Sequence, residues 1–399
     1  MPIVFIHGVN NRDGPAYVAG KLAIQAFLKR HLTGAAIDGK QLAAISNVWF
    51  PYWGDLATTF AWDMASLPQG EMQALGGAAS TDLQPLVAHV RDALAGALGP
   101  EPLTALAKKR LTLAVDVLTQ LALEAASPGN EAEIAAFVVE ASAYAEANPS
   151  PAWLAGVTTD AQLIAGLQAQ LAGVSSVQSM GGLGSIFQKI SLAGVKLKQA
   201  VAGVVGKAVD KTGDFASTKL LGWARSPLNA LLGRFFGDIF IYLSQRGDKS
   251  APGLIPKRII ADLDAAHQQA AGEPFVVIGH SLGGVITLDL LSHFRPDLDI
   301  DLFVSVGSQV AHFEELKLYK ASDPLIVPPK KAPTPTNIRH WINVYDEVDI
   351  FAYAAERVFD RVDVDGRYDT ETYTIKAHGA YFTQDRFYQR LRARIDALP

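Results

Sequence analysis

The residues best placed to carry chemistry lie in the C-terminal half of the chain, where Ser281 stands in the segment Gly-His-Ser-Leu-Gly at 279–283. An apolar run at 274–278 precedes the segment and a helical pattern follows it, as in the G-x-S-x-G turn that carries nucleophilic serines. In such a turn, glycines at the flanking positions avoid steric clashes with the strand and the helix on either side, and the serine takes a strained backbone conformation. The dipole of the helix that follows favours negative charge next to the serine. The pattern predicts Ser281 as a nucleophile. The alternative is a glycine-rich turn with an incidental serine.

A serine hydroxyl is a weak nucleophile and needs a base to take its proton. The histidines downstream of Ser281 are His293, His312, His340 and His378. Only His378 follows a further complete strand, which we expect near Glu371 to Lys376. We therefore predict His378 as the general base, in the loop after that strand, where a mobile imidazole can transfer a proton. The alternative is a structural or surface histidine.

The acid that orients this base should lie just beyond the expected strand at 339–345. Asp346, Glu347 and Asp349 are the candidates. Asp346 touches the strand end and is expected to cap the turn, whereas Asp349 lies where a carboxylate reaches the distal nitrogen of the imidazole and fixes its tautomer. We prefer Asp349, then Asp346, with Glu347 third.

Two N–H donors are needed to hold the oxyanion that forms when a serine attacks a carbonyl. One is expected to be the backbone N–H of Leu282, and the other the N–H of Val9, in the loop after the first strand. Gly8 allows that loop to turn its amides inward, and Asn10 either assists through its side chain or caps the turn. His7 and His280 flank the two segments and complete the predicted site, with His7 expected to be structural.

The elements that position these residues follow from hydrophobic patterning. Apolar runs predict strands. A 3.6-residue periodicity predicts four helices: one at 17–32, one that begins at 258, one that follows the serine turn and ends at about 294, and one at 384–398. The dipeptide Asp365-Gly366 predicts a turn. Because strands alternate with helices, we expect an α/β fold with a mainly parallel sheet covered by helices on both sides. The strands are predicted at 3–6, 45–52, 274–278, 302–306, 339–345 and 371–376.

A change of composition divides the chain. Residues 56–237 are rich in alanine, leucine and glycine and carry helical patterns without a convincing strand. We therefore predict an α/β core formed by 1–55 and 238–399, with a large helical cap or lid insertion at 56–237.

Two features of this insertion have alternative readings. An apolar series interspersed with lysines is either a basic amphipathic lid that contacts a membrane surface or ordinary core packing; it comprises Ile186, Phe187, Ile190, Val195, Leu197, Val201, Val204 and Val205. An aromatic cluster at its start lines an acyl pocket or belongs to the core; it comprises Trp49, Tyr52, Trp53, Phe60 and Trp62.

The composition excludes several classes of protein. The chain has 399 residues, 49% hydrophobic residues and a formal net charge of -5, which argues against disorder and against a nucleic-acid binder. It contains no cysteine, so disulfides and thiolate metal sites are excluded. The start of the chain lacks the pattern of a secretory signal, and we expect a cytoplasmic protein. The uncharged stretch 161–188 contains too many glutamines, serines and glycines for a membrane-spanning helix.

Taken together, the His-Gly loop at 7–8, the serine turn, Asp349 and the segment His-Gly-Ala-Tyr at 378–381 resemble the α/β-hydrolase superfamily, particularly its bacterial lipase-like and esterase-like members. The resemblance covers the first 55 residues and those after about Asp238. It implies a carboxylic-ester or acyl substrate, small or lipid, and neither metal nor cofactor. Two departures stand out: the His-Gly loop comes almost at the start, so the sheet should be trimmed at its N-terminal edge, and the helical insertion precedes the serine turn.

The predicted activity is therefore that of a serine hydrolase that cleaves esters through an acyl-enzyme. An acyltransferase or thioesterase with the same triad is the alternative among enzymes. The alternative from a different class of protein is a membrane- or partner-binding module on a hydrolase scaffold. The presence of the serine, the acid and the histidine together argues against that module.

Overall fold

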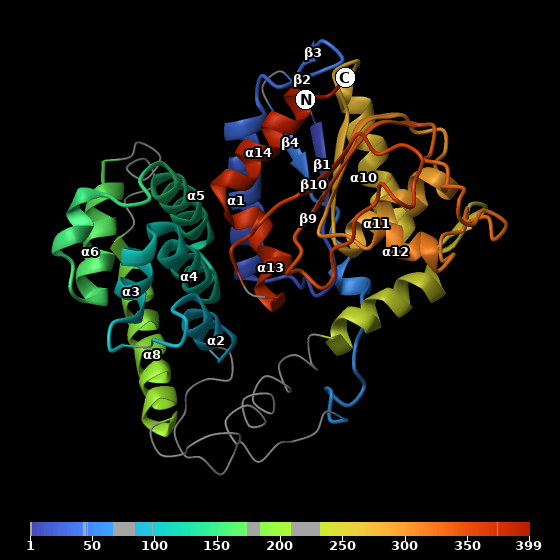
Figure 1. The fold of residues 1–399 in the computed structure, drawn as a ribbon. Helices are drawn as coiled ribbons and strands as arrows, with labels where there is room; N and C mark the ends of the chain where they lie inside the picture. The colour runs from blue at the N-terminus through green and yellow to red at the C-terminus, as the bar shows by residue number, and fades with distance from the viewer. Residues whose placement is uncertain are drawn as a thin grey trace.

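A six-stranded parallel sheet forms the centre of the protein (Figure 1). The computed structural model describes residues 2–42, 45, 47–66, 84–97, 99–173, 184–208, 232–372 and 374–399. Along the sheet the strand order is β10-β9-β8-β7-β1-β4. The strands are β1 (Pro2–Ile6), β4 (Asn47–Trp49), β7 (Val276–His280), β8 (Ile300–Val306), β9 (Ile338–Tyr345) and β10 (Val364–Arg367).

The central strands are buried on both faces, which explains their continuous apolar sequences. In β1, Ile3 and Phe5 enter one hydrophobic cluster, and Val4 and Ile6 enter the other. Pairing of Ile6 with Gly279 brings the ends of β1 and β7 together, so the loops that follow them are neighbours. Val9, Ser281 and Asp349 follow the carboxyl ends of β1, β7 and β9, the edge where open parallel sheets bind ligands.

Helices cover both faces of the sheet. On the face of Ile3 lie α1 (Pro15–Leu32) and α14 (Asp385–Asp396), preceded by α13 (Thr374–Ala380) and the short turn η6 (Tyr381–Thr383). On the opposite face lie α10 (Leu254–Ala270), α11 (Leu282–Asp289) and α12 (Val310–Glu315). The fold is therefore α/β, with a parallel sheet flanked by helices, as predicted.

A block of helices packs on the α1 side of the sheet (Figure 1). No strand occurs between residues 57 and 246 in the described part of the chain. We call this set the helical block: α2 (Gln84–Ala93), α3 (Pro102–Lys109), α4 (Leu111–Glu124), α5 (Glu131–Ala147), η4 (Ala152–Gly156), α6 (Asp160–Leu171) and α8 (Gly184–Ala208).

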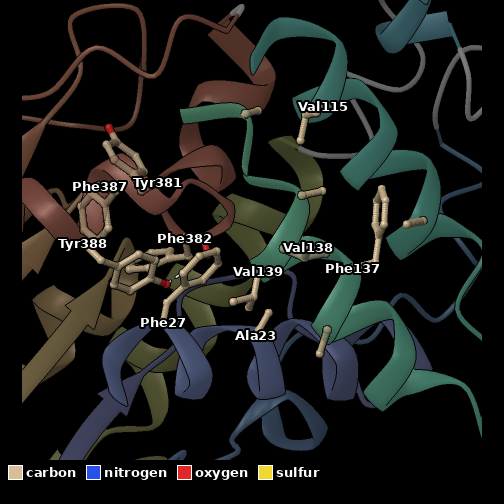
Figure 2. Packing of buried hydrophobic residues seen from close by; sticks show 14 of the residues in the cluster. Ala23, Phe27, Val115, Phe137, Val138, Val139, Tyr381, Phe382, Phe387 and Tyr388 are labelled. Carbon is tan, nitrogen blue, oxygen red and sulfur yellow. Dashed lines mark hydrogen bonds between the residues drawn. The ribbon is translucent and has the colours of Figure 1, made fainter. Parts of the chain in front are cut away.

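The interior of the helical block is continuous with the core of the sheet. Helix α5 packs against α1 and α14. Figure 2 shows Val138 and Val139 of α5 beside Ala23 and Phe27 of α1, next to aromatic side chains of the C-terminal segment. A single apolar cluster thus extends from the sheet into the block.

The lysine-rich apolar series of α8 is mainly core packing. Ile186, Phe187, Ile190, Leu197 and Val201 are buried in the same cluster, whereas Val195 is 52% exposed. The side chains of the last two members, Val204 and Val205, lie outside the described residues.

A helical segment at 232–245 spans the predicted boundary between insertion and core. Phe235 and Tyr242 pack in the cluster on the α11 side of the sheet. Tyr242 OH and Arg246 Nη1 donate to Asp289 Oδ2, at 2.8 and 2.7 Å, and this carboxylate is fully buried. Buried charges require such partners, so the segment is fixed to the end of α11.

Two local predictions were wrong. The described residues near Glu371 to Lys376 form no strand, and α13 begins there at Thr374. The last strand is instead β10, which contains Asp365 and Gly366, the pair predicted to form a turn. Hydrogen bonds to other parts of the chain fix β10 at the sheet edge. The Asp365 carboxylate accepts Asn343 Nδ2–H from β9 and the N–H groups of Ala355 and Glu356.

The uncharged stretch 161–188 is divided in the structure. Helix α6 ends at Leu171 and α8 begins at Gly184, while residues 174–183 lie outside the described chain. Among the described residues, no helix combines the length and the apolar character needed to traverse a bilayer.

Candidate active site

Ser281 occupies a sharp turn between β7 and α11. Its backbone has φ 54° and ψ -128°, a region that residues other than glycine rarely adopt, and the residue is fully buried. Close packing requires the surrounding glycines: a Cβ on Gly279 would lie 2.5 Å from Gly284 Cα, and one on Gly283 would lie 2.1 Å from Ile6 O. The strained turn predicted from the motif is therefore present.

The loop after β1 approaches Ser281 closely. A Cβ at Gly8 would lie 2.5 Å from Ser281 Cβ and 3.0 Å from Ser281 Oγ. Only glycine therefore fits at position 8, and this explains the His-Gly pair in the sequence.

The imidazole of His378 is held by the carboxylate of Asp349. His378 Nδ1 lies 3.1 Å from Asp349 Oδ1 and 3.0 Å from Oδ2. The fully buried Asp349 also accepts Phe351 N–H and Tyr381 OH, each at 3.0 Å. An ionised carboxylate with these donors assigns the proton to Nδ1 and leaves Nε2 as an acceptor.

The other two candidate acids have different partners. Asp346 accepts Thr370 N–H and Thr370 Oγ1–H at 2.7 and 2.6 Å and caps its own turn through Val348 N–H. Glu347 is on the surface and pairs with Arg367 at 2.9 Å. Asp349 is therefore the candidate that contacts the histidine.

Tyr381 links two of these carboxyl residues and was not assigned a role from the sequence. Its hydroxyl accepts Asp346 N–H and donates to Asp349 Oδ2. Burial and the adjacent Asp349 charge raise the pKa of Tyr381 well above its ordinary value, so the hydroxyl remains a donor.

His378 lies in helix α13, whereas the sequence predicted a loop after a strand. The helix is connected to the serine turn by His280, whose Nε2–H donates to the backbone oxygen of His378 at 2.7 Å. The two imidazole rings are 4.8 Å apart. Burial, followed by the nearby His378 ring, holds the pKa of His280 well below its ordinary value, so His280 is neutral near pH 7.

Ser281 and His378 both lie near the carboxyl ends of β7 and β8. Ser281 N–H donates to Val306 O at 3.0 Å, and a Cβ on the next residue, Gly307, would lie 3.6 Å from His378 Nδ1. Ser281 Oγ and His378 Nε2 are both buried, and neither has a hydrogen-bond partner among the described residues. No hydrogen bond joins these two atoms in this structure. Such contacts are often long in enzymes without substrate and tighten in the complex.

The two predicted oxyanion donors are next in sequence to residues at the turn: Leu282 follows Ser281, and Val9 follows Gly8. Leu282 is the first residue of α11, a position whose N–H has no partner within a helix. Val9 follows the tightly packed Gly8. The side chain of Asn11 donates to the carbonyl oxygens of Gly8 and Val9, at 3.0 and 3.1 Å, and so fixes the orientation of these peptides.

Asn10 makes hydrogen bonds through its backbone and through its side chain, whose Oδ1 accepts Arg234 Nη1–H at 3.4 Å. It has φ 60°, and its N–H donates to Asp238 Oδ2 at 2.9 Å. The fully buried Asp238 also accepts Thr58 N–H and forms a 3.0 Å ion pair with Arg12. Nothing in the local sequence indicated Asp238, because its partners lie 180 to 228 residues away along the chain.

His7 has structural contacts on every side. Its Nδ1–H donates to Gly8 O at 2.9 Å, and its Nε2 accepts Trp53 N–H at 3.3 Å. The ring stacks on Trp53, with centroids 5.1 Å apart and planes inclined by 7°. Burial is the main cause that lowers the pKa of His7 to about 4, so this imidazole is neutral near pH 7.

A cavity of about 350 Å³ adjoins His378 and the loop after β1. Its wall comes from α1, from α4 and α5 of the helical block, and from the α13 segment. The lining is largely apolar and includes Phe5, Ile24, Phe50, Leu123, Val138 and Phe382.

The predicted aromatic cluster does not form this wall. None of its five members is among the described residues that line the cavity. Trp53 is buried against His7, whereas Trp62 is 83% exposed. The neighbouring Phe50 lines the cavity instead.

In the described part of the chain, no group of three or more histidine and acidic side chains is arranged to hold a metal ion. Comparison with known proteins gives no match: no protein-family model, no curated protein and no solved structure matches the chain. The class defined by the sheet and its helices is an α/β protein with a polar site at the carboxyl ends of its parallel strands.

Proposed function

We propose that the protein is a serine hydrolase of the α/β-hydrolase type that cleaves carboxylic esters. One observation carries the proposal: the imidazole of His378 is held by Asp349 through Nδ1, while its buried Nε2 is unpartnered beside the strained turn of Ser281, whose hydroxyl is also unpartnered. Buried polar atoms normally have partners. The complementary chemistry of these two unpartnered atoms, a hydroxyl and a ring nitrogen at one sheet edge, supports a catalytic role.

In the proposed acylation step, Ser281 Oγ attacks the ester carbonyl carbon while His378 Nε2 takes the hydroxyl proton. The carbonyl oxygen becomes an oxyanion and accepts the N–H groups of Val9 and Leu282. The intermediate collapses, the C–O bond breaks, and the imidazolium returns its proton to the departing alcohol. Asp349 stabilises the imidazolium throughout.

In the second step, water attacks the acyl-enzyme. His378 takes a proton from the water, the tetrahedral intermediate forms again at the same donors, and collapse releases the acid and restores the serine hydroxyl. The helical block serves as a cap in this proposal, since Leu123 and Val138 close one side of the cavity next to His378.

The test is labelling by a fluorophosphonate probe together with hydrolysis of p-nitrophenyl esters. We expect the wild type to be labelled and active, and Ser281→Ala to lose both properties without loss of fold. Asp349→Asn should reduce kcat by about 10³- to 10⁴-fold, because the wrong imidazole tautomer is then favoured. Ser250→Ala, which removes an exposed hydroxyl in a turn, is the matched control and should behave as the wild type.

A folded wild type that is neither labelled nor active would refute the proposal and favour a binding module. Labelling that persists in Ser281→Ala would assign the chemistry to another residue. Transfer of the acyl group to an added alcohol or thiol in preference to water would identify an acyltransferase.

A further inference from the structure

Helix α1 contributes a lysine, Lys21, to the lining of the cavity. Lys21 lines the cavity, is partly buried, and forms no ion pair with any described residue. No aspartate or glutamate is among the lining residues. The carboxylate of Asp13, just before α1, accepts Gly14 N–H and does not pair with Lys21.

A second donor lies one helical turn away. Tyr17 lines the same cavity, and the Lys21 ammonium is 5.8 Å from the centre of its ring. The Tyr17 hydroxyl is buried and has no hydrogen-bond partner in the described part of the chain. Burial is the main cause that raises the pKa of Tyr17 to about 12, so the hydroxyl keeps its proton and remains a donor.

The surroundings of these two donors are apolar. Ile24, one turn further along α1, lines the cavity together with Phe50, Leu123 and Val138. In such surroundings the buried Tyr17 hydroxyl is unfavourable without an acceptor, and the partly buried Lys21 ammonium can donate to the same ligand. The chemistry that satisfies both is an anion with several acceptor oxygens.

We propose that the substrate is an ester that carries an anionic group, a carboxylate or a phosphate, which Lys21 Nζ and Tyr17 OH bind together. The hydrocarbon part of this substrate lies against Phe50, Leu123 and Val138, and the ester reaches the site at His378. This inference rests on the proposed function and names its substrate class.

The test compares kcat/KM for two matched pairs of esters. The first pair is p-nitrophenyl hexanoate and the p-nitrophenyl monoester of adipic acid, in which the anion is on the acyl side. The second pair is 1-hexanoylglycerol and its 3-phosphate, in which the anion is on the alcohol side. We expect the wild type to prefer the anionic member of at least one pair, and that pair identifies which side carries the charge.

Lys21→Met retains the length and apolar stem of the side chain and removes its charge. We expect it to lower kcat/KM for the preferred anionic ester about tenfold, which corresponds to about 1.4 kcal/mol, and to leave the neutral ester within about twofold. Tyr17→Phe should lower the same ratio about threefold, in line with a single hydrogen bond. Lys29→Met removes an exposed charge from the last turn of α1 and should change neither ester.

Salt provides an independent readout. At about 1 M salt the Debye length falls to about 3 Å, so the wild type should lose part of its anionic preference while Lys21→Met should not change. Equal use of charged and neutral esters by the wild type, or a preference that survives in Lys21→Met, overturns the inference. In either case labelling of Ser281 and cleavage of the neutral esters would leave the proposed function intact, whereas loss of both would refute that function itself.

Discussion

Acidification should destabilise the protein through His7, and the size of the effect follows from the structure. The imidazole is 4% exposed, stacked on Trp53, and accepts Trp53 N–H at Nε2. A proton at Nε2 would replace this acceptor with a second donor facing the N–H. Burial, and next the charge of Arg12, therefore oppose protonation, and the pKa falls from 6.5 to about 4.

The sign follows from proton linkage. Between pH 6.5 and about 4 the unfolded chain binds a proton at His7 that the folded chain does not, so the free energy of unfolding falls as pH falls. At about 1.36 kcal/mol per pH unit, the loss from this residue between pH 7 and pH 4 is about 3 kcal/mol. The contribution is complete above pH 6.5 and is lost as pH falls through about 4.

The assay is urea unfolding of the wild type and of His7→Gln at several values of pH. Glutamine keeps one donor and one acceptor but does not titrate, so the variant should be less stable at pH 7 and should show a pH dependence smaller by about 3 kcal/mol. Groups that titrate elsewhere, such as the partly buried Asp116, whose pKa desolvation raises to about 7, affect both proteins equally. Equal pH slopes in the two proteins would refute the reasoning.

Two further substitutions test the packing around the site and the buried charge beside it. Gly8→Ala places a methyl group 2.5 Å from Ser281 Cβ, so esterase activity and probe labelling should fall at least about 100-fold, with about 1 to 3 kcal/mol of lost stability. The control is Gly99→Ala, where nothing lies within 4 Å of the added methyl group, and it should leave activity and stability unchanged. An active Gly8→Ala variant would contradict the geometry. Asp289→Ala removes the partner of a buried arginine and should lower the free energy of unfolding, measured in urea, by about 3 to 5 kcal/mol. Asp297→Ala, at a surface ion pair, should lower it by less than about 1 kcal/mol. Equal losses in the two variants would refute the distinction between buried and surface ion pairs.

The sheet could be predicted largely from the sequence because its central strands are buried on both faces and therefore apolar throughout. The edge strand β10 differs. Its sequence, Val-Asp-Gly-Arg, has no apolar run, and its place is fixed by the hydrogen bonds of Asp365 to Asn343 and to the loop before it. Such long-range bonds leave no local pattern, so the strand was assigned to the following segment.

The candidate site likewise combines features that leave a local sequence pattern with features that depend on long-range contacts. The strained turn at Ser281 could be predicted because a sharp strand-to-helix turn requires glycines at neighbouring positions in the sequence. The positions of Asp349 and His378 followed from chain order, although the helix that carries His378 did not. Asp238 could not be predicted, since its role depends on contacts with a loop at the other end of the chain.

The shared apolar cluster of α1 and α5 has a consequence for how the molecule opens and unfolds. Swinging the helical block away as a rigid lid would expose Val138, Val139, Ala23 and Phe27 to water, at roughly 1.5 to 3 kcal/mol for each large side chain. Calorimetry should accordingly record one cooperative transition for sheet and block together. A shortened chain without α4 and α5 would expose the apolar face of α1 to water, and it should aggregate rather than behave as a minimal enzyme.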